Sequence, residues 1–253
     1  MIVFLIFASM RYFVEFSYNG TNYHGWQKQP NAHTVQEELN KCFSVLLQKP
    51  IELMGAGRTD TGVHAIQMFA HFDYNLPIES EKLVYKMNSF LPTDISVSKV
   101  FKVKEDSHAR FSATSRTYQY FVSDKKDIFN PNLHLVYKDL DIDKMNEACK
   151  YLMGEHDFTS FSKVHTETFT NNCTITKALW QKDRDTFVFT ISANRFLRNM
   201  VRSLVGTFLD VGSGKINVSD VKNIIDKKDR CEAGVSVPAK ALFLTQICYP
   251  ENI

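Results

Sequence analysis

One carboxylate in a glycine-rich stretch has the setting of a nucleophile. Asp60 lies in GAGRTDTGVHA, residues 55–65, where it is the only acid and Arg58 precedes it by two positions. The neighbouring glycines let the backbone approach a ligand closely, and a nearby arginine favours the ionised form of a carboxyl group. A turn cap that bonds its own backbone is the common alternative for such an aspartate. The stretch alone leaves both interpretations open.

Arginines without acidic neighbours form a second candidate site. Arg195, Arg198 and Arg202 are spaced i, i+3 and i+7, which places them on one face of a helix expected over residues 196–211. Residues 186–209 contain no acid. The planar guanidinium group matches phosphate oxygens, so this face suits a nucleic-acid backbone. An ordinary solvated helix face is the alternative.

Aromatic and basic residues are interleaved near the middle of the chain. They are Arg110, Phe111, Arg116, Tyr118, Tyr120, Lys125 and Lys126. This alternation favours a single-stranded or flipped base over a duplex, and half-buried strand packing is the alternative for the tyrosines.

Around Trp26, polar side chains such as Asn22, His24 and Gln27 would be costly to bury without partners. That loop is therefore also expected to contact nucleic acid.

The bulk properties are those of an ordinary globular protein. The 253 residues are 44% hydrophobic and 23% charged, and the net charge of +2 does not by itself indicate a polyanion partner. Five scattered cysteines without a C-x-x-C pair, and eight histidines without ligand spacing, lead us to expect a reducing cytoplasm and no metal. The apolar start, residues 1–8, is far shorter than the roughly 18 residues of a membrane span, so no membrane partner is expected.

The order of predicted elements repeats along the chain. Alternating and helical patterns predict β-α-β-β-α-β over the first half and the same order over the second, as in the split βαβ unit of ferredoxin-like folds. A capping box of Thr34 and Glu37 is expected to start the first helix. The predicted strands are residues 11–18, 51–54, 67–73, 95–103, 116–123, 173–182, 186–193 and 241–249, and the later helices are residues 79–90, 142–153, 196–211 and 218–226.

The sequence therefore predicts an α+β fold of two ferredoxin-like halves, with their sheets side by side around a central basic cleft. Residues 11–107 form the N-terminal half with the Asp60 loop, and residues 108–253 form the C-terminal half with the arginine face. Residues 1–10 are expected to be an N-terminal extension or an added piece of strand. Ligand sites favour interfaces between domains, so the cleft is the expected site.

The Asp60 stretch resembles the signature G-R-T-D-A-G-V-H of the tRNA pseudouridine synthase A family. Seven further blocks resemble that family in the same order: residues 18–29, 34–36, 108–114, 116–118, 157–161, 196–202 and 238–244. The chain departs from the family pattern at three positions. Thr61 replaces the signature alanine, Asn19 replaces a more usual aspartate, and Ala241 stands where glycine is expected.

The resemblance implies an isomerase that converts uridine to pseudouridine in the anticodon arm of tRNA, at about positions 38–40, after extruding the base. It also implies a cytoplasmic homodimer that needs no cofactor. Asp60 would be the nucleophile, attacking ribose C1′ or base C6, and Arg202 would pair with it. Tyr118 would stack on the uracil, Arg58 would hold the place of the extruded nucleotide, and Leu244 would form an apolar wall. The remaining expected substrate-binding residues are Arg110, Arg195 and Arg198.

Two other classes of function fit parts of this pattern. A catalytically silent RNA-binding protein of the same fold would keep the arginines and tyrosines. It gives no reason, however, for the carboxylate of Asp60 in a basic RNA groove, where it repels phosphate. A glycoside or nucleoside hydrolase generally needs two carboxylates across the scissile bond, and the loop supplies only one.

Overall fold

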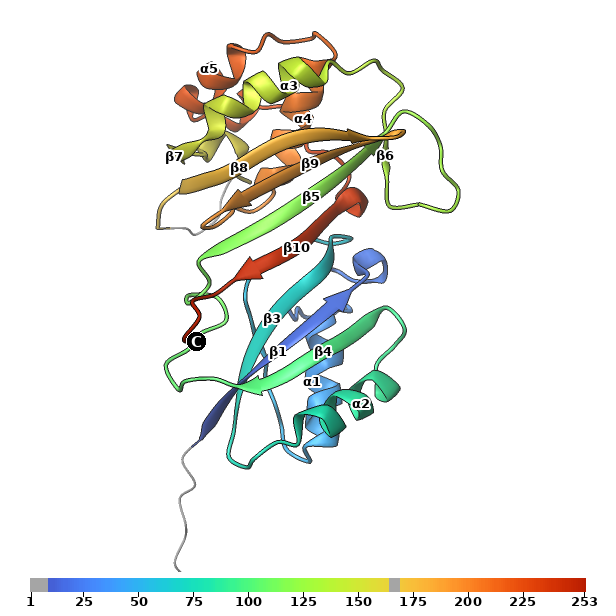
Figure 1. The fold of residues 1–253 in the computed structure, drawn as a ribbon, viewed down its shortest axis with the longest axis vertical. Helices are drawn as coiled ribbons and strands as arrows, with labels where there is room; N and C mark the ends of the chain where they lie inside the picture. The colour runs from blue at the N-terminus through green and yellow to red at the C-terminus, as the bar shows by residue number, and fades with distance from the viewer. Residues whose placement is uncertain (1–8, 164–168) are drawn as a thin grey trace, which may run out of the picture. The chain divides into compact units, whose positions relative to one another are not determined.

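The computed structural model describes residues 9–163 and 169–253, and its chain divides into two compact units (Figure 1). Unit 1 comprises Met1–Thr114 together with Ile247–Ile253, and unit 2 comprises Ser115–Gln246. Unit 1 is therefore built from two separate stretches of the sequence. Over the described ranges, no helix combines the length and the apolar character needed to cross a membrane.

Unit 1 is a sheet with two helices. Its elements are β1 (Met10–Tyr18), η1 (Gly20–Asn22), α1 (Val35–Leu46), β2 (Met54–Gly55), β3 (His64–Tyr74), α2 (Ser80–Phe90) and β4 (Ile95–Lys102). Antiparallel pairing gives the order β4-β1-β3, and β2 pairs with the edge of β3 opposite β1. Alternation along β1 buries Val14 and Phe16, and the apolar face of α1 buries Leu39 and Phe43. The Phe43 ring packs 4.7 Å from Phe72 of β3, which joins helix to sheet.

Unit 2 repeats this plan with additional short elements. They are β5 (Ser115–Ser123), β6 (His134–Leu135), α3 (Ile142–Cys149), η2 (Lys150–Leu152), β7 (Gly154–Asp157), η3 (Thr159–Phe161), β8 (Asn172–Asp183), β9 (Thr186–Ala193), α4 (Met200–Gly212), α5 (Asp220–Lys227), η4 (Arg230–Glu232), η5 (Ala239–Ala241) and β10 (Leu242–Cys248). The strand order is β10-β5-β9-β8-β7. Trp180 of β8 stacks 4.9 Å from Phe189 of β9, and Phe208 of α4 packs 5.2 Å from Phe189, so the core lies between sheet and α4.

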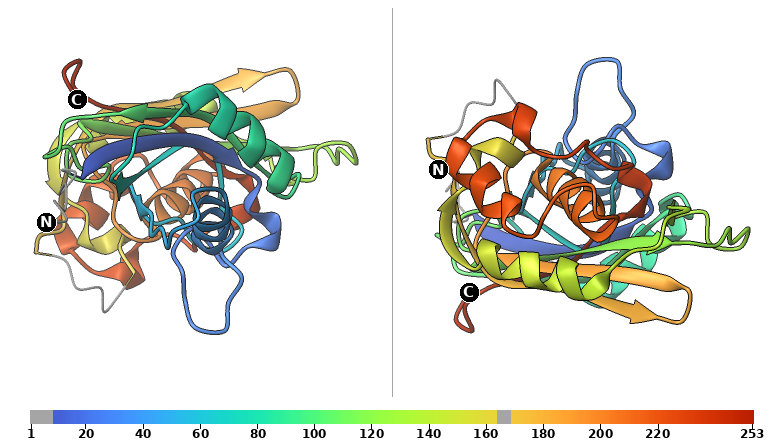
Figure 2. Two further views of the ribbon diagram at one scale, coloured as in Figure 1. Left: turned by 90° about the horizontal axis from the view of Figure 1, so that it is seen from below. Right: turned by 90° about the horizontal axis from the view of Figure 1, so that it is seen from above.

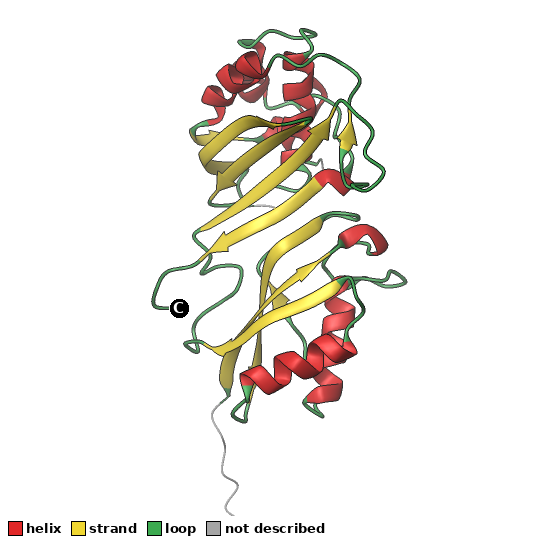
Figure 3. Ribbon diagram, turned by 45° about the vertical axis from the view of Figure 1, so that its right-hand side comes forward, coloured by secondary structure: helices red, strands yellow, loops and turns green. Residues whose placement is uncertain are grey.

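The two units share one strand order. Numbering the four main strands within each unit gives 4-1-3-2 in both, as β4-β1-β3-β2 and as β10-β5-β9-β8. The helices fall at the same two places in each series, and Figure 3 distinguishes helices from strands in both units. The predicted α+β class and the repeated β-α-β-β-α-β order are confirmed.

The predicted helix over residues 196–211 is wrong at its start. Helix α4 begins at Met200, because Asn199 has a left-handed backbone conformation with φ of 67° and ψ of 0°. Such a conformation is incompatible with continuing a right-handed helix through that residue. Arg195 and Arg198 therefore precede the helix, and the predicted single helical face of three arginines, which included Arg202, is not formed.

The predicted capping box at Thr34 is also wrong. The Thr34 side chain makes no capping hydrogen bond, and its buried hydroxyl has no partner among the described residues. Carbonyl groups from an earlier loop replace it: Gly25 accepts from the Val35 N–H over 3.3 Å, and Trp26 accepts from the Gln36 N–H over 3.0 Å. The first helical donors are thus satisfied by tertiary contacts.

The boundary between the two units, as the contacts define it, lies later in the chain than the boundary expected from the sequence. Residues 108–114 lie in unit 1 rather than with the C-terminal stretch, and the last strand leaves unit 2 after Gln246. In unit 1, the Thr114 N–H donates to the Cys248 carbonyl over 2.9 Å, and the Ile247 N–H donates to the Gln67 side chain over 3.0 Å. Most of the expected N-terminal extension, residues 1–8, lies outside the described residues, and β1 begins at Met10.

Candidate active site

Asp60 begins a tight turn in the loop between β2 and β3. The Val63 N–H donates to the Asp60 carbonyl over 3.1 Å, and Gly62, the third residue of the turn, has φ of 77°. These values match a type II turn, which requires a residue that tolerates positive φ at that position. Thr61, the second residue, is exposed. The larger threonine side chain therefore fits where the family signature has alanine without displacing packed atoms.

The segment of residues 18–26 holds this loop in place. The Tyr18 hydroxyl lies 2.8 Å from Thr59 Oγ1, and the Trp26 N–H donates to the Thr59 carbonyl over 3.4 Å. Gly25 has φ of 87°, and a Cβ atom there would lie 2.2 Å from the same carbonyl oxygen. Only glycine permits both this conformation and this approach. The residue before Asp60 is consequently fixed by contacts with three residues.

Trp26 belongs to the core, whereas its polar neighbours do not. The indole is 2% exposed and stacks 5.2 Å from Phe16 of β1. The polar side chains that surround it in sequence are exposed: Asn22, His24, Gln27 and Gln29. Their loop, drawn in blue, projects from unit 1 in both views of Figure 2. These polar groups are exposed, and the nucleic-acid contact expected of this loop stays a prediction.

The far side of the Asp60 turn is also anchored. His64, at the start of β3, is 1% exposed, and its Nδ1 accepts the Gly20 N–H over 3.0 Å. Asn19 caps η1 by accepting the Thr21 N–H over 3.1 Å, so an asparagine serves here in place of the family's aspartate. Arg58 is exposed on the same loop. Asp60 and Arg58 thus belong to one anchored loop of unit 1.

Arg110 comes from a short segment that packs onto the sheet of unit 1. The Ala109 N–H donates to Nδ1 of His71 on β3 over 3.2 Å, and the Tyr249 hydroxyl donates to the Ala109 carbonyl over 2.6 Å. The Arg110 guanidinium lies 5.3 Å from the centroid of the exposed Phe111 ring, within cation–π range. One basic and one aromatic side chain are therefore presented together from a fixed backbone.

The His71 contact predicts a stability change with pH. Burial, then the neighbouring His108 and Arg11, lower the pKa of the His71 imidazole to about 4 in the folded protein. Above pH ~6.5 both the folded and the unfolded states are neutral at this group, so it contributes nothing. Below that pH the unfolded chain takes up a proton that the folded protein does not. We expect the free energy of unfolding to fall by on the order of 2 kcal/mol between pH ~6.5 and ~4.

Urea denaturation at a series of pH values checks this expectation. His71→Asn keeps an oxygen that accepts the Ala109 N–H but removes the titrating ring, so its stability should depend less steeply on pH over that interval. His24→Asn, in the exposed loop, is the matched control and should keep the wild-type slope. An unchanged slope in His71→Asn would show that His71 is not the titrating group.

Unit 2 places Tyr118 against an aromatic wall. Its half-buried ring on β5 meets Phe196 edge to face, with centroids 5.2 Å apart and planes at 90°. Tyr120 lies on the same face of the strand and is buried, and its hydroxyl donates to the Pro238 carbonyl over 2.9 Å. Leu244 is 2% exposed on β10, the strand beside β5. The predicted stacking residue and the predicted apolar residue thus lie on adjacent strands.

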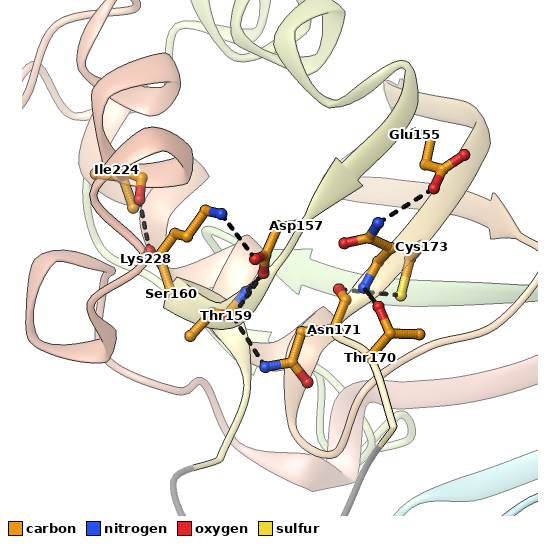
Figure 4. Close-up of polar contacts among 10 residues, drawn as sticks. Glu155, Asp157, Thr159, Ser160, Thr170, Asn171, Cys173, Ile224 and Lys228 are labelled. Atoms are coloured by element: carbon orange, nitrogen blue, oxygen red, sulfur yellow. Dashed lines mark hydrogen bonds and ion pairs between the residues drawn. The ribbon is translucent and has the colours of Figure 1, made fainter.

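A polar network surrounds the 3₁₀ turn η3 (Figure 4). Asp157 pairs with Lys228 at 3.1 Å and accepts the Thr159 N–H over 3.0 Å. Burial alone would raise the pKa of Asp157, but the hydrogen bonds from Thr159 and Lys228 hold that pKa below its usual value. Asn171 also donates to the Thr159 hydroxyl over 2.9 Å. The network fixes the 3₁₀ turn η3 beside α5.

The backbone just beyond η3 reaches Arg198 directly. The Lys163 N–H donates to the Arg198 carbonyl over 3.0 Å, and the Arg198 side chain is exposed. Arg195 is half-buried. Arg202, in the first turn of α4, donates from Nε to the Val237 carbonyl over 2.7 Å. Arg198 and Arg202 are therefore held by separate local contacts rather than by one helix face.

The predicted site residues come from both units. Unit 1 supplies Asp60, Arg58 and Arg110, and unit 2 supplies Tyr118, Arg195, Arg198, Arg202 and Leu244. Sequence reasoning missed the role of Gly25, although it lies inside a block that resembles the family. It also missed Asn199 and Ser236, whose contact joins positions 37 residues apart in number and carries no local signal.

Comparisons with known proteins give a consistent result. A model of the tRNA pseudouridine synthase family matches residues 16–112 and 148–250, which include Asp60 and Arg202 but leave Tyr118 between the two matched stretches. The chain is 53% identical over 247 residues to tRNA pseudouridine synthase A of Parabacteroides distasonis, covering 96% of this chain and 97% of that protein. It is 52% identical over 246 residues to the protein of the same name from Bacteroides fragilis, covering 96% and 98%. Identity to the Thermoanaerobacter pseudethanolicus protein of that name is 42% over 236 residues, covering 92% and 96%.

Proposed function

Because this chain belongs to the family of tRNA pseudouridine synthases, we propose that it isomerises uridines of tRNA to pseudouridines. The proposed target is the anticodon arm, at about positions 38–40, where the base must be extruded before an enzyme reaches its glycosidic bond. The reaction moves the ribose from a nitrogen to a carbon of the same base. It therefore consumes no co-reactant, and the proposed enzyme uses no cofactor.

Asp60 is the proposed nucleophile. The family resemblance carries this assignment, and the fixed turn is the structural observation that supports it. On one route the carboxylate attacks ribose C1′ and displaces N1 of the uracil. On the other it adds to base C6, and the N1–C1′ bond then breaks. After the uracil turns, the C5–C1′ bond forms and Asp60 is released. The C5 proton then passes to a proton acceptor in the site, and N1 of the uracil takes up a proton. The contacts of Thr59 support this role, because they hold the loop in shape before substrate arrives.

The other proposed roles are those that the family resemblance implies. Tyr118 stacks on the extruded uracil and takes part in removing the C5 proton, and Leu244 forms an apolar wall of the pocket. Arg58 occupies the place that the extruded nucleotide leaves in the RNA helix. Arg202 keeps Asp60 ionised by its charge. The proposed phosphate-binding residues are Arg110, Arg195 and Arg198.

Tritium release tests the proposed reaction. Each turnover frees the hydrogen of uridine C5, so tRNA labelled with tritium at that carbon should release the label to water when the protein is added. Free uracil measured in the same sample would instead indicate hydrolysis, and tight binding without either product would indicate a silent RNA-binding protein. Substrates in which the uridines at about positions 38–40 are changed to cytidine one at a time locate the target.

Arg198→Ala should weaken tRNA binding without slowing the chemical step. Arg198 is exposed and its backbone is held through Lys163, so the proposed phosphate contact would form at the surface from a fixed position. Losing one such contact should reduce the slope of log Kd against log salt by about 1. Filter binding at several salt concentrations measures the slope, and single-turnover tritium release at saturating enzyme measures the chemical step.

Lys222→Ala is the matched control for that experiment. Lys222 is an exposed cation on α5 of the same unit. Its removal should leave the slope of log Kd against log salt unchanged. A wild-type slope in Arg198→Ala would rule out a phosphate contact at that residue.

We also propose that the enzyme is a cytoplasmic homodimer, as the resemblance implies. Light scattering over a range of protein concentrations measures the mass of the particle in solution. Fractionation of cells measures where the protein and its tRNA substrate occur together. A monomer mass at every concentration would contradict the dimer, and recovery outside the cytoplasmic fraction would contradict the location.

A further inference from the structure

The segment of residues 230–238 lies directly on helix α4. A Cβ atom on Gly206 of α4 would lie 1.9 Å from the Val235 carbonyl oxygen, and one on Gly234 would lie 2.5 Å from the Thr207 backbone nitrogen. The Gly234 N–H also donates to the Thr207 hydroxyl over 2.9 Å. Backbone meets backbone here, so movement of the segment and of the first turns of α4 is mechanically linked.

Ser236 is the polar junction between this segment and the start of α4. Its hydroxyl oxygen accepts from Asn199 Nδ2 over 2.5 Å and from Arg230 Nη2 over 2.9 Å. Asn199 is the left-handed residue immediately before α4. Asparagine tolerates the left-handed conformation better than most residues, and a side-chain contact favours it further. The Ser236 hydroxyl supplies such a contact, and Arg230 holds that hydroxyl from the other side.

Arg202 lies one helical turn beyond Asn199 and meets the same segment. Its Nε donates to the Val237 carbonyl over 2.7 Å, and the Val237 N–H donates back to the Arg202 carbonyl over 3.3 Å. The bond at Nε fixes the rotation of the planar guanidinium group, which sets where its remaining N–H groups point. Ser236 and Val237 are consecutive, so a shift of the first moves the acceptor of Arg202.

We propose that Ser236, braced by Arg230, is a positioning residue for the Arg202 guanidinium. Through Asn199 it fixes where α4 begins, and through Val237 it fixes the carbonyl that orients Arg202. This inference rests on the proposed function, in which Arg202 keeps the nucleophile ionised. Ser236 itself touches neither substrate nor the reacting atoms. Its effect reaches the reaction only through the placement of one cation.

Ser236→Ala should lower the rate of the chemical step without weakening substrate binding. A small misplacement of a positioned charge costs rate far more than affinity, and we expect kcat to fall about 10-fold while KM for tRNA changes less than about twofold. Ser236→Thr keeps the hydroxyl and should recover most of the lost kcat. Ser219→Ala, an exposed serine just before α5, is the matched control and should behave as wild type.

Coupling to Arg202 distinguishes positioning from a general loss of structure. Arg202→Lys removes the planar donor group, so adding Ser236→Ala to it should lower kcat little further. Thermal unfolding of every variant shows whether it is folded at the assay temperature. Should Ser236→Ala prove unstable, Asn199→Gly provides a second route, because glycine adopts the left-handed conformation without strain but lacks the amide that reaches Ser236. We expect the same selective loss of kcat.

Three results would overturn the inference while leaving the proposed function intact in an active wild type. The first is a wild-type kcat in Ser236→Ala. The second is a double variant of Ser236→Ala and Arg202→Lys whose kcat falls by the product of the two single decreases. The third is a wild-type kcat in Asn199→Gly. A wild-type kcat in Arg202→Lys would show that a positive charge at this position suffices without an oriented guanidinium, which would also overturn this inference. Absence of tritium release by the wild type would overturn the proposed function itself.

Discussion

Asp60→Asn is expected to reduce tritium release from C5-labelled tRNA by at least about 10³-fold. The amide is nearly the same size as the carboxylate, so the type II turn and the contacts of Thr59 should survive. It is not a competent nucleophile, however, and no covalent adduct with ribose or base should form. Single-turnover assays with enzyme in excess over tRNA measure the loss directly.

A binding measurement and a control variant show whether the lost activity is due to the lost nucleophile. Affinity of Asp60→Asn for tRNA, measured by filter binding, should be equal to that of the wild type or tighter, because a negative charge near phosphate has been removed. Glu52→Gln removes an exposed carboxylate before the same loop and should keep full activity. If Asp60→Asn releases tritium at a rate near that of the wild type, Asp60 is not the nucleophile.

Gly25→Ala is expected to destabilise unit 1 and to inactivate the enzyme together. A methyl group at this position would lie 2.2 Å from the Thr59 carbonyl oxygen, and the residue has φ of 87°. Left-handed strain costs about 1–2 kcal/mol, and relief of the steric overlap costs about 1–3 kcal/mol more. The overlap is relieved only by moving the backbone just before Asp60. Urea denaturation should therefore show a loss of about 2–5 kcal/mol, and tritium release should fall even where the protein remains folded.

Gly57→Ala is the matched control for stability in that experiment. A Cβ atom on Gly57 would meet no atom within 4 Å, although the residue lies in the same loop. Its unfolding free energy should stay within about 1 kcal/mol of the wild type. Equal stabilities of Gly25→Ala and Gly57→Ala would mean that the close approach at Thr59 is relaxed without cost.

Features with short-range signals were predictable from the sequence. The alternation along β1 and the helical spacing of Leu39 and Phe43 depend on neighbours within one element, and the repeated order of elements along the chain followed from such patterns. The Asp60 turn was visible because Gly62 is a local requirement of its backbone. Its assignment to catalysis rests on the family resemblance and stays a prediction.

Features set by distant contacts were not predictable. The start of α1 looked like a capping box at Thr34, yet the carbonyls of Gly25 and Trp26 occupy the helix donors. The start of α4 depends on Asn199, whose backbone conformation is supported by Ser236 far along the chain. The spacing i, i+3 and i+7 places three residues on one helical face only if all three lie in the helix. Arg195 and Arg198 lie before α4, so that condition is not met.

Unit 1 is built from two separate stretches of the sequence, so it cannot be completed early in synthesis. Tyr249 packs on Phe13 and Phe69 with ring centroids 5.3 and 5.2 Å apart, and it donates to Ala109. The ribosome must make all of residues 115–246 before these closing contacts exist. Domains generally fold as they emerge, but β10, which pairs with β5 of unit 2, lies at the same end of the chain. Neither unit 2 nor the sheet that carries Asp60 is therefore complete until that last strand has been made.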